Sequence, residues 1–257
     1  MYKESYNLKG KRAFITGGGR GIGLCSADAL AEAGANIVIS DIHEKLLEEG
    51  MSFLRSKTYQ VEGFLLNVAN ASATEELAEQ VEGKFGPFGI LVANAGIAGP
   101  DTPAEKMTAE AWQWILDINL NEVFWSCRAF GKRMVERQQG AIVTVGSKSG
   151  FISNKPQKRV NYNSSKAAVH HLTRSLAGEW ADRGVRVNSV APTYVNTPMS
   201  NITAKDSQYF DVKMQGTPMR PMIDPEEVAA AIFFLAPPSA STITGAILPV
   251  DAGYTIW

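Results

Sequence analysis

A glycine-rich turn near the start of the chain constrains the fold more than any other stretch. Residues 12–16 form a short, mostly apolar run, residues 17–23 read GGGRGIG, and a helical pattern then continues up to Gly34. Glycine permits a tight turn and a close backbone approach to pyrophosphate, and the following helix offers free N–H groups to phosphate. The stretch predicts a dinucleotide-binding turn made of Gly17, Arg20, Gly21, Ile22 and Gly23. Its spacing differs from the general G-x-G-x-x-G pattern, so a plain tight turn is the alternative.

Asp41 follows a second apolar run, residues 36–40. An acidic side chain there can accept hydrogen bonds from the adenosine ribose hydroxyls and repels a 2′-phosphate. Ile42 offers no compensating cation, so the sequence favours NAD over NADP. Arg20 argues the other way, because a cation in the glycine turn could receive a 2′-phosphate. Asp41 as the N-cap of the next helix is the structural alternative.

Apolar runs and helical patterns keep alternating along the chain. Further strands are predicted at residues 61–66, 90–93, 141–145 and 246–250, with another ending at Pro192. Small or polar residues follow two of these runs and are predicted to line the cofactor: Asn67, Val68, Asn94, Ala95 and Gly96. The alternation predicts an α/β protein, a Rossmann fold with a doubly wound parallel seven-stranded sheet and helices on both faces. No linker or repeat divides residues 1–257, so we predict a single domain.

Tyr162 and Lys166 lie four residues apart in a helical pattern, so they share one helix face. An ammonium beside a phenol favours the phenolate and lowers the pKa of the tyrosine toward the range useful for proton transfer. Ser147 ends the apolar run at residues 141–145 and can place a hydroxyl on the same substrate oxygen. Together they predict a Ser/Tyr/Lys site in which Tyr162 is the general acid or base. An ordinary surface pair is the alternative reading of Tyr162 and Lys166.

Composition and charge exclude several classes of partner. Net charge is -1 with both signs interspersed, which argues against nucleic-acid and membrane partners and favours small molecules. The N-terminus lacks the apolar core of a signal peptide and no apolar run is long enough to span a membrane, so we expect a cytoplasmic protein. Cys25 and Cys127 suggest neither a disulfide nor a zinc motif. The three histidines, at positions 43, 170 and 171, lack metal-ligand spacing, and no metal site is predicted.

One long helix is predicted from about residue 109 to residue 137, with Asn119 in its middle. Asparagine competes for backbone hydrogen bonds inside helices. Asn119 is therefore expected to mark a bend or a water site.

These motifs, in this order, resemble the short-chain dehydrogenase/reductase family over essentially the whole chain. The resemblance implies that Tyr162 moves the hydroxyl proton, that Ser147 steadies the substrate oxygen and that Lys166 lowers the pKa of the tyrosine while binding the nicotinamide ribose. It further implies that Asn119 holds a water of the proton relay through its bent helix. The loop after the sixth strand is implied to contact the cofactor through Pro192, Val195 and Thr197. This loop departs from the family, which usually has Pro-Gly where this chain has Pro192-Thr193.

The long loop between Ser147 and Tyr162 and the C-terminal residues 250–257 are similar to polyol dehydrogenases, galactitol dehydrogenases among them, and to ketose reductases. Hydrogen-bonding side chains in or near the site are predicted to contact a hydroxyl-rich substrate: Ser147, Ser149, Asn154, Gln157 and Tyr194. The alternative is that the loop side chains only satisfy a turn.

The leading functional prediction is NAD-dependent, reversible oxidation of a polyol to a ketose. An NADPH-dependent carbonyl reductase, including a 3-oxoacyl reductase, is the catalytic alternative, and a cofactor-binding regulator without activity is the third. Residues 193–222 are predicted to form a lid over the substrate. The family resemblance implies a homotetramer, with the apolar tail ending at Trp257 either in a subunit interface or folded on its own subunit.

Overall fold

The computed structural model describes residues 2–200, 210–212, 215–219 and 222–257. Seven strands form one sheet in the order β3-β2-β1-β4-β5-β6-β7, and every neighbouring pair is parallel. They are β1 (Arg12–Thr16), β2 (Asn36–Asp41), β3 (Val61–Leu65), β4 (Ile90–Ala93), β5 (Gly140–Val145), β6 (Val185–Pro192) and β7 (Ile247–Val250). The strand order reverses at β1, and ligands of such sheets bind where the order reverses, beyond the carboxyl ends of the strands.

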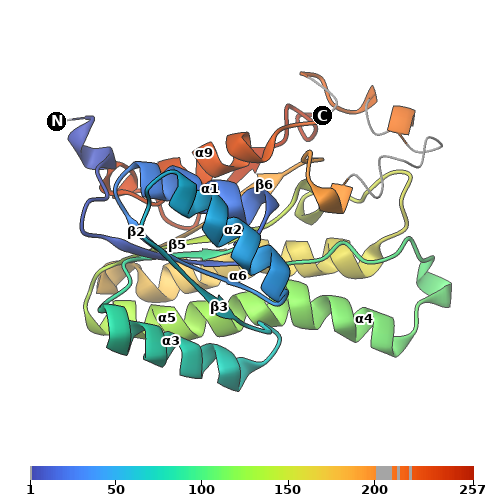
Figure 1. The fold of residues 1–257 in the computed structure, drawn as a ribbon. Helices are drawn as coiled ribbons and strands as arrows, with labels where there is room; N and C mark the ends of the chain where they lie inside the picture. Colours follow the sequence, from blue (N-terminus) through green and yellow to red (C-terminus); the bar gives the residue numbers. More distant parts are fainter. Residues whose placement is uncertain (1, 201–209, 213–214, 220–221) are drawn as a thin grey trace.

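Helices cover both faces of this sheet (Figure 1). The α-helices are α1 (Gly21–Glu32), α2 (Glu44–Ser56), α3 (Ala71–Phe85), α4 (Ala109–Leu116), α5 (Glu122–Glu136), α6 (Val160–Trp180) and α9 (Pro225–Leu235). Short 3-10 turns are η1 (Glu4–Tyr6), η2 (Ala104–Lys106), η4 (Lys148–Gly150), η5 (Ala181–Arg183) and η6 (Pro238–Ala240). This arrangement confirms the predicted single-domain Rossmann fold with its doubly wound parallel sheet.

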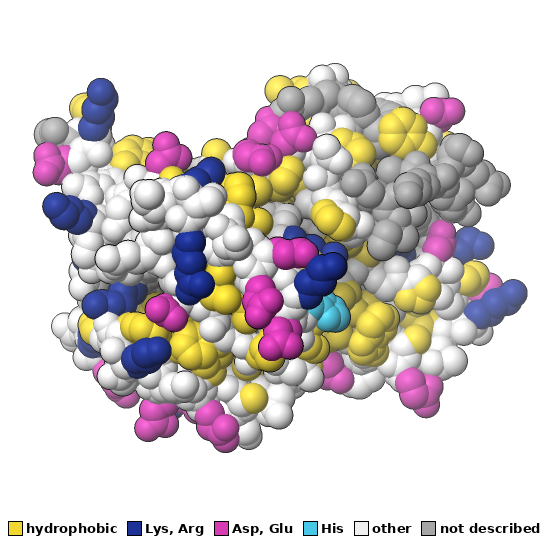
Figure 2. Space-filling model, viewed as in Figure 1, with side chains coloured by type: hydrophobic (Ala, Val, Ile, Leu, Met, Phe, Trp, Pro, Cys, Tyr) yellow, Lys and Arg dark blue, Asp and Glu magenta, His cyan; other side chains and the backbone are white. Residues whose placement is uncertain are grey.

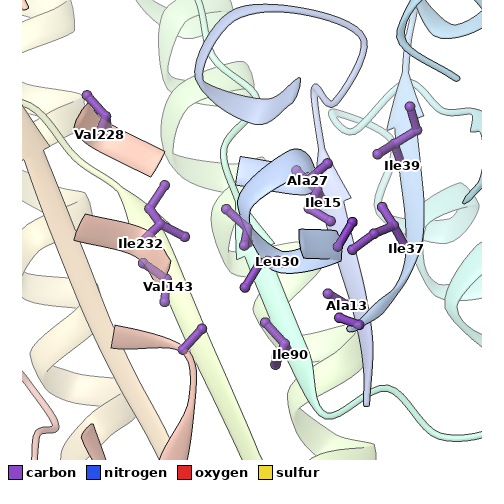
Figure 3. Packing of buried hydrophobic residues seen from close by; sticks show 14 of the residues in the cluster. Ala13, Ile15, Ala27, Leu30, Ile37, Ile39, Ile90, Val143, Val228 and Ile232 are labelled. Carbon is purple, nitrogen blue, oxygen red and sulfur yellow. The ribbon is translucent and has the colours of Figure 1, made fainter. Parts of the chain in front are cut away.

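Adjacent residues of a buried strand serve opposite faces of the sheet, because side chains alternate along a strand. Ile15 of β1 packs beneath α1, α2 and α9, together with Leu30 and Ile232. Figure 3 shows this cluster, with Ala27 and Leu30 of α1 near the β1 side chains and Ile232 of α9 near Val143 of β5. Phe14, the preceding residue, instead packs on the opposite face, beneath α3, α5 and α6. Continuous apolar strands are therefore explained by burial on both faces.

The predicted helix over residues 109–137 is interrupted, which corrects the sequence interpretation. The structure has α4, then one π-helical turn, η3 (Asp117–Asn121), then α5. Asn119 lies in the π-turn and is fully buried. A single π-turn inserts extra backbone into a helix and frequently marks a functional site. The helix irregularity expected at Asn119 thus takes the form of a π-turn.

Acidic and basic side chains are interspersed on the face shown in Figure 2, without a large area of one sign. Within the described ranges, none of the helices combines the length and the apolar character needed to cross a bilayer.

Candidate active site

The glycine turn after β1 is held in a conformation that side chains would disturb. Gly17 and Gly21 have φ angles of 60° and 56°, in the left-handed region that favours glycine. A Cβ on Gly23 would lie 2.2 Å from the Gly17 carbonyl oxygen. Asn94, at the end of β4, donates from Nδ2 to the carbonyl oxygens of Thr16 and Gly17, at 2.8 and 3.1 Å. The turn is thus fixed to the neighbouring strand and leads directly into the N-terminus of α1.

Asp41 ends β2 beside this turn and is 9% exposed. Its Oδ2 accepts a hydrogen bond from the Gly19 N–H at 3.2 Å, and its Oδ1 accepts one from the His43 N–H at 3.1 Å. The alternative that Asp41 caps α2 is wrong, because the residue preceding this helix is His43. The carboxylate instead lines a cavity above the glycine turn.

This cavity of about 330 Å³ runs along the carboxyl ends of the strands. Most residues predicted from the sequence to contact cofactor or substrate line it: Gly17, Arg20, Gly21, Ile22, Asp41, Asn67, Val68, Asn94, Ala95, Gly96, Ser147, Ser149, Asn154, Gln157, Tyr162, Lys166, Pro192, Tyr194, Val195 and Thr197. Two predicted residues are buried behind the wall, Gly23 and Asn119. Lining residues that the sequence interpretation missed include Leu66, Ile97, Lys148 and Arg159.

The residues around the glycine turn fit a nicotinamide dinucleotide. The turn leaves no room for side chains, since a Cβ on Gly17 would lie 3.1 Å from the Ala95 Cα. The N-terminus of α1 at Gly21 is suited to pyrophosphate, and Asp41 is suited to a ribose hydroxyl. Tyr162 and Lys166 lie on the same cavity, toward the end of β5.

Lys166 is buried, at 4% exposed, and its ammonium donates to the Val145 carbonyl oxygen at 2.8 Å. Burial lowers the pKa of Lys166 to about 8, while the negative charge of Glu122 opposes this shift. The bond to Val145 places the ammonium at the end of β5, two residues before Ser147. Lysine and serine are therefore positioned by the same strand.

The pKa of Tyr162 does not behave as the sequence predicts. Burial raises it, a hydrogen bond with Ser147 and the positive charge of Arg159 lower it, and Lys166 has no resolved effect on it in the chain alone. The Lys166 ammonium donates to the Val145 carbonyl oxygen, and among the side chains it is the Ser147 hydrogen bond that lowers the pKa of the phenol most. Ser147 and Tyr162 thus form the pair that would face a substrate oxygen.

The side chain of Asn119 forms hydrogen bonds with the backbone of the segment that follows β4. Its Oδ1 accepts from the Ile97 N–H and its Nδ2 donates to the Ile97 carbonyl oxygen, both at 2.8 Å. The same Nδ2 lies 3.4 Å from the Ser165 hydroxyl on α6. The π-turn therefore ties the cavity wall at residues 94–97 to the helix that carries Tyr162 and Lys166.

His170 is a missed residue that supports Ser147. Its Nε2 accepts the Ser147 N–H at 3.4 Å, and the ring lies so close to Gly146 and Gly150 that a Cβ on either would be within about 2.5 Å of it. Burial, followed by the charges of Lys166 and Arg174, lowers the pKa of His170 to about 4. The imidazole is therefore neutral at pH 7 and can accept this bond. Its position four residues after Lys166 was the available signal.

The loop side chains expected to contact substrate form hydrogen bonds with other side chains of the protein. The Ser149 hydroxyl donates to Asn154 Oδ1 at 2.8 Å, and Asn154 Nδ2 donates to Asn163 Oδ1 at 3.0 Å. This supports the turn-satisfying alternative, although Ser149 and Asn154 also line the cavity. The network holds the loop between Ser147 and Tyr162 in a fixed shape.

The buried side chain of Lys148, next to Ser147, also lines the cavity. Lys148 is 2% exposed, and its ammonium lies 3.2 Å from the Tyr254 ring centroid and 4.1 Å from that of Tyr194. Such cation–π contacts are strongest where water is excluded. Tyr254 belongs to the C-terminal segment and is not itself a lining residue, so this segment supports Lys148 from behind the wall.

The predicted lid, residues 193–222, lies partly outside the described residues, which omit 201–209, 213–214 and 220–221. Described residues at its start line the cavity, among them Tyr194, Thr197 and Ser200. No group of three or more potential metal ligands occurs in the described part of the chain.

Comparison with known proteins decides the family. A family model described as "Enoyl-(Acyl carrier protein) reductase" matches residues 17–255. The galactitol 2-dehydrogenase of Rhizobium johnstonii is 48% identical over 100% of this chain and 99% of the relative. The chain belongs to the short-chain dehydrogenase/reductase family. It is an oxidoreductase that acts on CH–OH groups.

Solved structures of this family share the fold closely. The crystal structure of gox2181 is 43% identical, with a TM-score of 0.98, and covers 100% of both chains. A gluconate 5-dehydrogenase from Burkholderia cenocepacia, solved in complex with NADP and tartrate, is 30% identical with a TM-score of 0.94, again over 100% of both chains. Members of the short-chain dehydrogenase/reductase family use NAD or NADP as cofactor.

Proposed function

We propose that this enzyme catalyses the reversible, NAD-dependent oxidation of a secondary hydroxyl of a polyol to the corresponding ketose. The observation that carries this proposal is one cavity with Ser147, Tyr162 and Lys166 toward the end of β5 and Asp41 at the end of β2. Similarity to a galactitol 2-dehydrogenase over the whole chain supports a polyol substrate. Polar lining residues of the Ser147 loop are consistent with a hydroxyl-rich ligand.

In the proposed mechanism, Tyr162 is the general base that removes the substrate hydroxyl proton. Ser147 holds the substrate oxygen, since its side chain lines the same cavity as the phenol of Tyr162. Lys166 supplies positive charge behind Tyr162 and is proposed to bind the nicotinamide ribose, and Asn119 fixes the wall on which both act. When bound, the nicotinamide accepts a hydride from the substrate carbon, and its positive ring favours the phenolate of Tyr162.

Asp41 supports NAD as the cofactor. A buried carboxylate that already accepts two backbone N–H bonds is fixed in place and would meet a 2′-phosphate with like charge. Ile42 is 57% exposed and brings no cation to this end of the cavity. Arg20 is exposed on the same cavity and is the feature that favours NADP.

The second candidate is an NADPH-dependent carbonyl reductase, including a 3-oxoacyl reductase. Arg20 and the acyl carrier protein reductases in the description of the matching family model favour it. A non-catalytic regulator is disfavoured because Ser147, Tyr162 and Lys166 are all present and lie on one cavity. We further propose small-molecule partners only, without nucleic acid or membrane, a cytoplasmic location and a homotetramer.

The test is the initial rate of nicotinamide reduction at alkaline pH with C4 to C6 sugar alcohols and simple secondary alcohols, using NAD and NADP in parallel. We expect a strong NAD-linked rate confined to certain polyols. Tyr162→Phe should retain cofactor binding and lose turnover by about 100-fold or more, because the proton acceptor is removed. Tyr59→Phe, remote from the cavity, is the control. Activity only with NADP, or only with apolar alcohols, would replace this proposal with the carbonyl reductase.

A further inference from the structure

Glu122 is a carboxylate buried in the protein interior with too few partners. It is the first residue of α5 and is 0% exposed. Its Oε2 accepts a hydrogen bond from the Ser126 hydroxyl at 3.4 Å, while Oε1 is buried without a hydrogen-bond partner among the described residues. Glutamate is almost never fully buried unless paired, because removing a carboxylate from water is costly. Packing alone does not explain this residue.

Glu122 lies beside the two groups that the proposed mechanism uses behind Tyr162. It follows the π-turn directly, three residues after Asn119, and both the π-turn and α5 pack against α6, the helix that carries Lys166. Asn119 and Lys166 meet at Gly96, where an added Cβ would lie 3.2 Å from Asn119 Oδ1 and 3.6 Å from Lys166 Nζ. The charges of Glu122 and Lys166 act on each other across the α5–α6 contact, without direct ion-pair contact.

The titratable groups around this pair are few. On α5 the neighbour of Glu122 is the Cys127 thiol, whose pKa is raised by burial and by Glu122. On α6, Lys166 is flanked by Tyr162 and by His170, which is neutral at pH 7. Glu122 is therefore the charge that acts on the ammonium of Lys166.

Burial raises the pKa of Glu122 to about 8 and lowers that of Lys166 to about 8. As the pH rises through this range, Glu122 ionises at the same pH values at which Lys166 would otherwise lose its proton. The new negative charge then favours the ammonium. The proposed assay of alcohol oxidation is made in this alkaline pH range. The order in which Glu122 and Lys166 lose their protons therefore affects the charge of Lys166 during turnover.

We propose that Glu122 is a positioning residue of this active site, a buried counter-charge that keeps Lys166 in its cationic form at alkaline pH. The inference rests on the proposed function for its role in turnover. The electrostatic part of the inference, that an anion at Glu122 favours the cation at Lys166, involves only residues of this chain and needs no substrate.

The test compares the wild type with Glu122→Gln, an isosteric change that removes the ionisation. The first measurement is the affinity for NADH, or for NADPH if only that binds, from pH 6 to pH 10. Lys166 is proposed to bind the ribose, so affinity should fall as the ammonium loses its proton. In Glu122→Gln this fall should begin about one pH unit lower and leave affinity about tenfold weaker at alkaline pH. Near pH 6.5 the two proteins should agree within about threefold.

The second measurement is stability without ligand. A carboxyl with a raised pKa keeps its proton in the folded protein where the unfolded chain has released it, so the free energy of unfolding falls as pH rises from about 4.3 to about 8. Glu122→Gln should lose this slope. Ser126→Ala removes the hydrogen bond but keeps the charge, and should behave as the wild type in both measurements.

A loss of cofactor affinity that is equal at all pH values, or a stability slope unchanged by Glu122→Gln, would overturn the inference. Neither measurement needs a polyol. Failure of the polyol assay with a shifted affinity profile would therefore remove the proposed substrate and keep the role of Glu122.

Discussion

Single polar residues determine what this cavity can bind, and Asp41 is the clearest case. Its carboxylate is positioned by two backbone N–H groups rather than by a flexible contact. Arg20 lies on the same cavity with opposite charge. The proposed preference for NAD over NADP therefore depends on two side chains whose positions the sequence already indicated.

We predict that Asp41→Asn shifts the ratio of kcat/KM values for NAD and NADP toward NADP by about tenfold, because the repulsion of a 2′-phosphate is removed. Arg20→Gln should shift the same ratio toward NAD. Steady-state kinetics with both cofactors measure the two effects. An unchanged ratio in Asp41→Asn would mean that the carboxylate does not face the ribose.

Buried charges are what the sequence could not predict at this scale. Lys148 and Glu122 belong to residue types that are mostly exposed, and only tertiary packing buries them here. The helical spacing of His170 from Lys166 within α6 was a usable signal. It was not decisive, because the neighbouring His171 is exposed and helix phase alone does not say which histidine faces inward.

Elements were predicted best where the signal is local. The β1–glycine turn–α1 unit, whose signal lies within residues 12–32, matches the structure. The π-turn between α4 and α5 was anticipated only as a bend at Asn119. Its register change depends on the bonds from Asn119 to Ile97, a partner 22 residues away.

Helix α6 carries a pH-dependent contribution to stability through His170. Its pKa is lowered to about 4 in the folded protein, against about 6.5 when unfolded, so the unfolded chain binds more protons between these values. This contribution is complete above pH 6.5 and is lost as pH falls toward 4. We predict that the wild type loses about 2 kcal/mol more than His170→Gln between pH 7 and pH 4.5.

Urea unfolding of both proteins at the two pH values measures this difference. His171→Gln, which changes the exposed neighbour, should lose as much stability as the wild type. Equal losses in all three proteins would remove His170 from this role.

At the scale of the whole molecule, the predicted homotetramer stays a prediction, and the exposed apolar residues give it a test. Ile256 and Trp257 are 68% and 82% exposed, whereas Tyr254 in the same tail packs against Lys148 of its own subunit. Trp114 on α4 is also 49% exposed. Large apolar side chains gathered at a surface mark association sites more often than chance exposure does.

Light scattering on the purified protein should give four times the chain mass of 27.8 kDa. Ile256→Ser with Trp257→Ser is expected to weaken assembly at least tenfold, because apolar surface is lost from an interface. Tyr2→Ser, at a residue 84% exposed near the other terminus, is the control. A monomeric wild type would contradict the prediction.

The contact between Lys148 and Tyr254 connects the C-terminal segment to a residue that lines the cavity. Asp251 fixes the turn that presents Tyr254, since its Oδ2 accepts from the Thr255 N–H at 2.9 Å and its Oδ1 from the Gly253 N–H at 3.1 Å. The C-terminal turn therefore supports a lining residue of the cavity from behind, and removing it would take away the aromatic ring that contacts the Lys148 ammonium from residue 254.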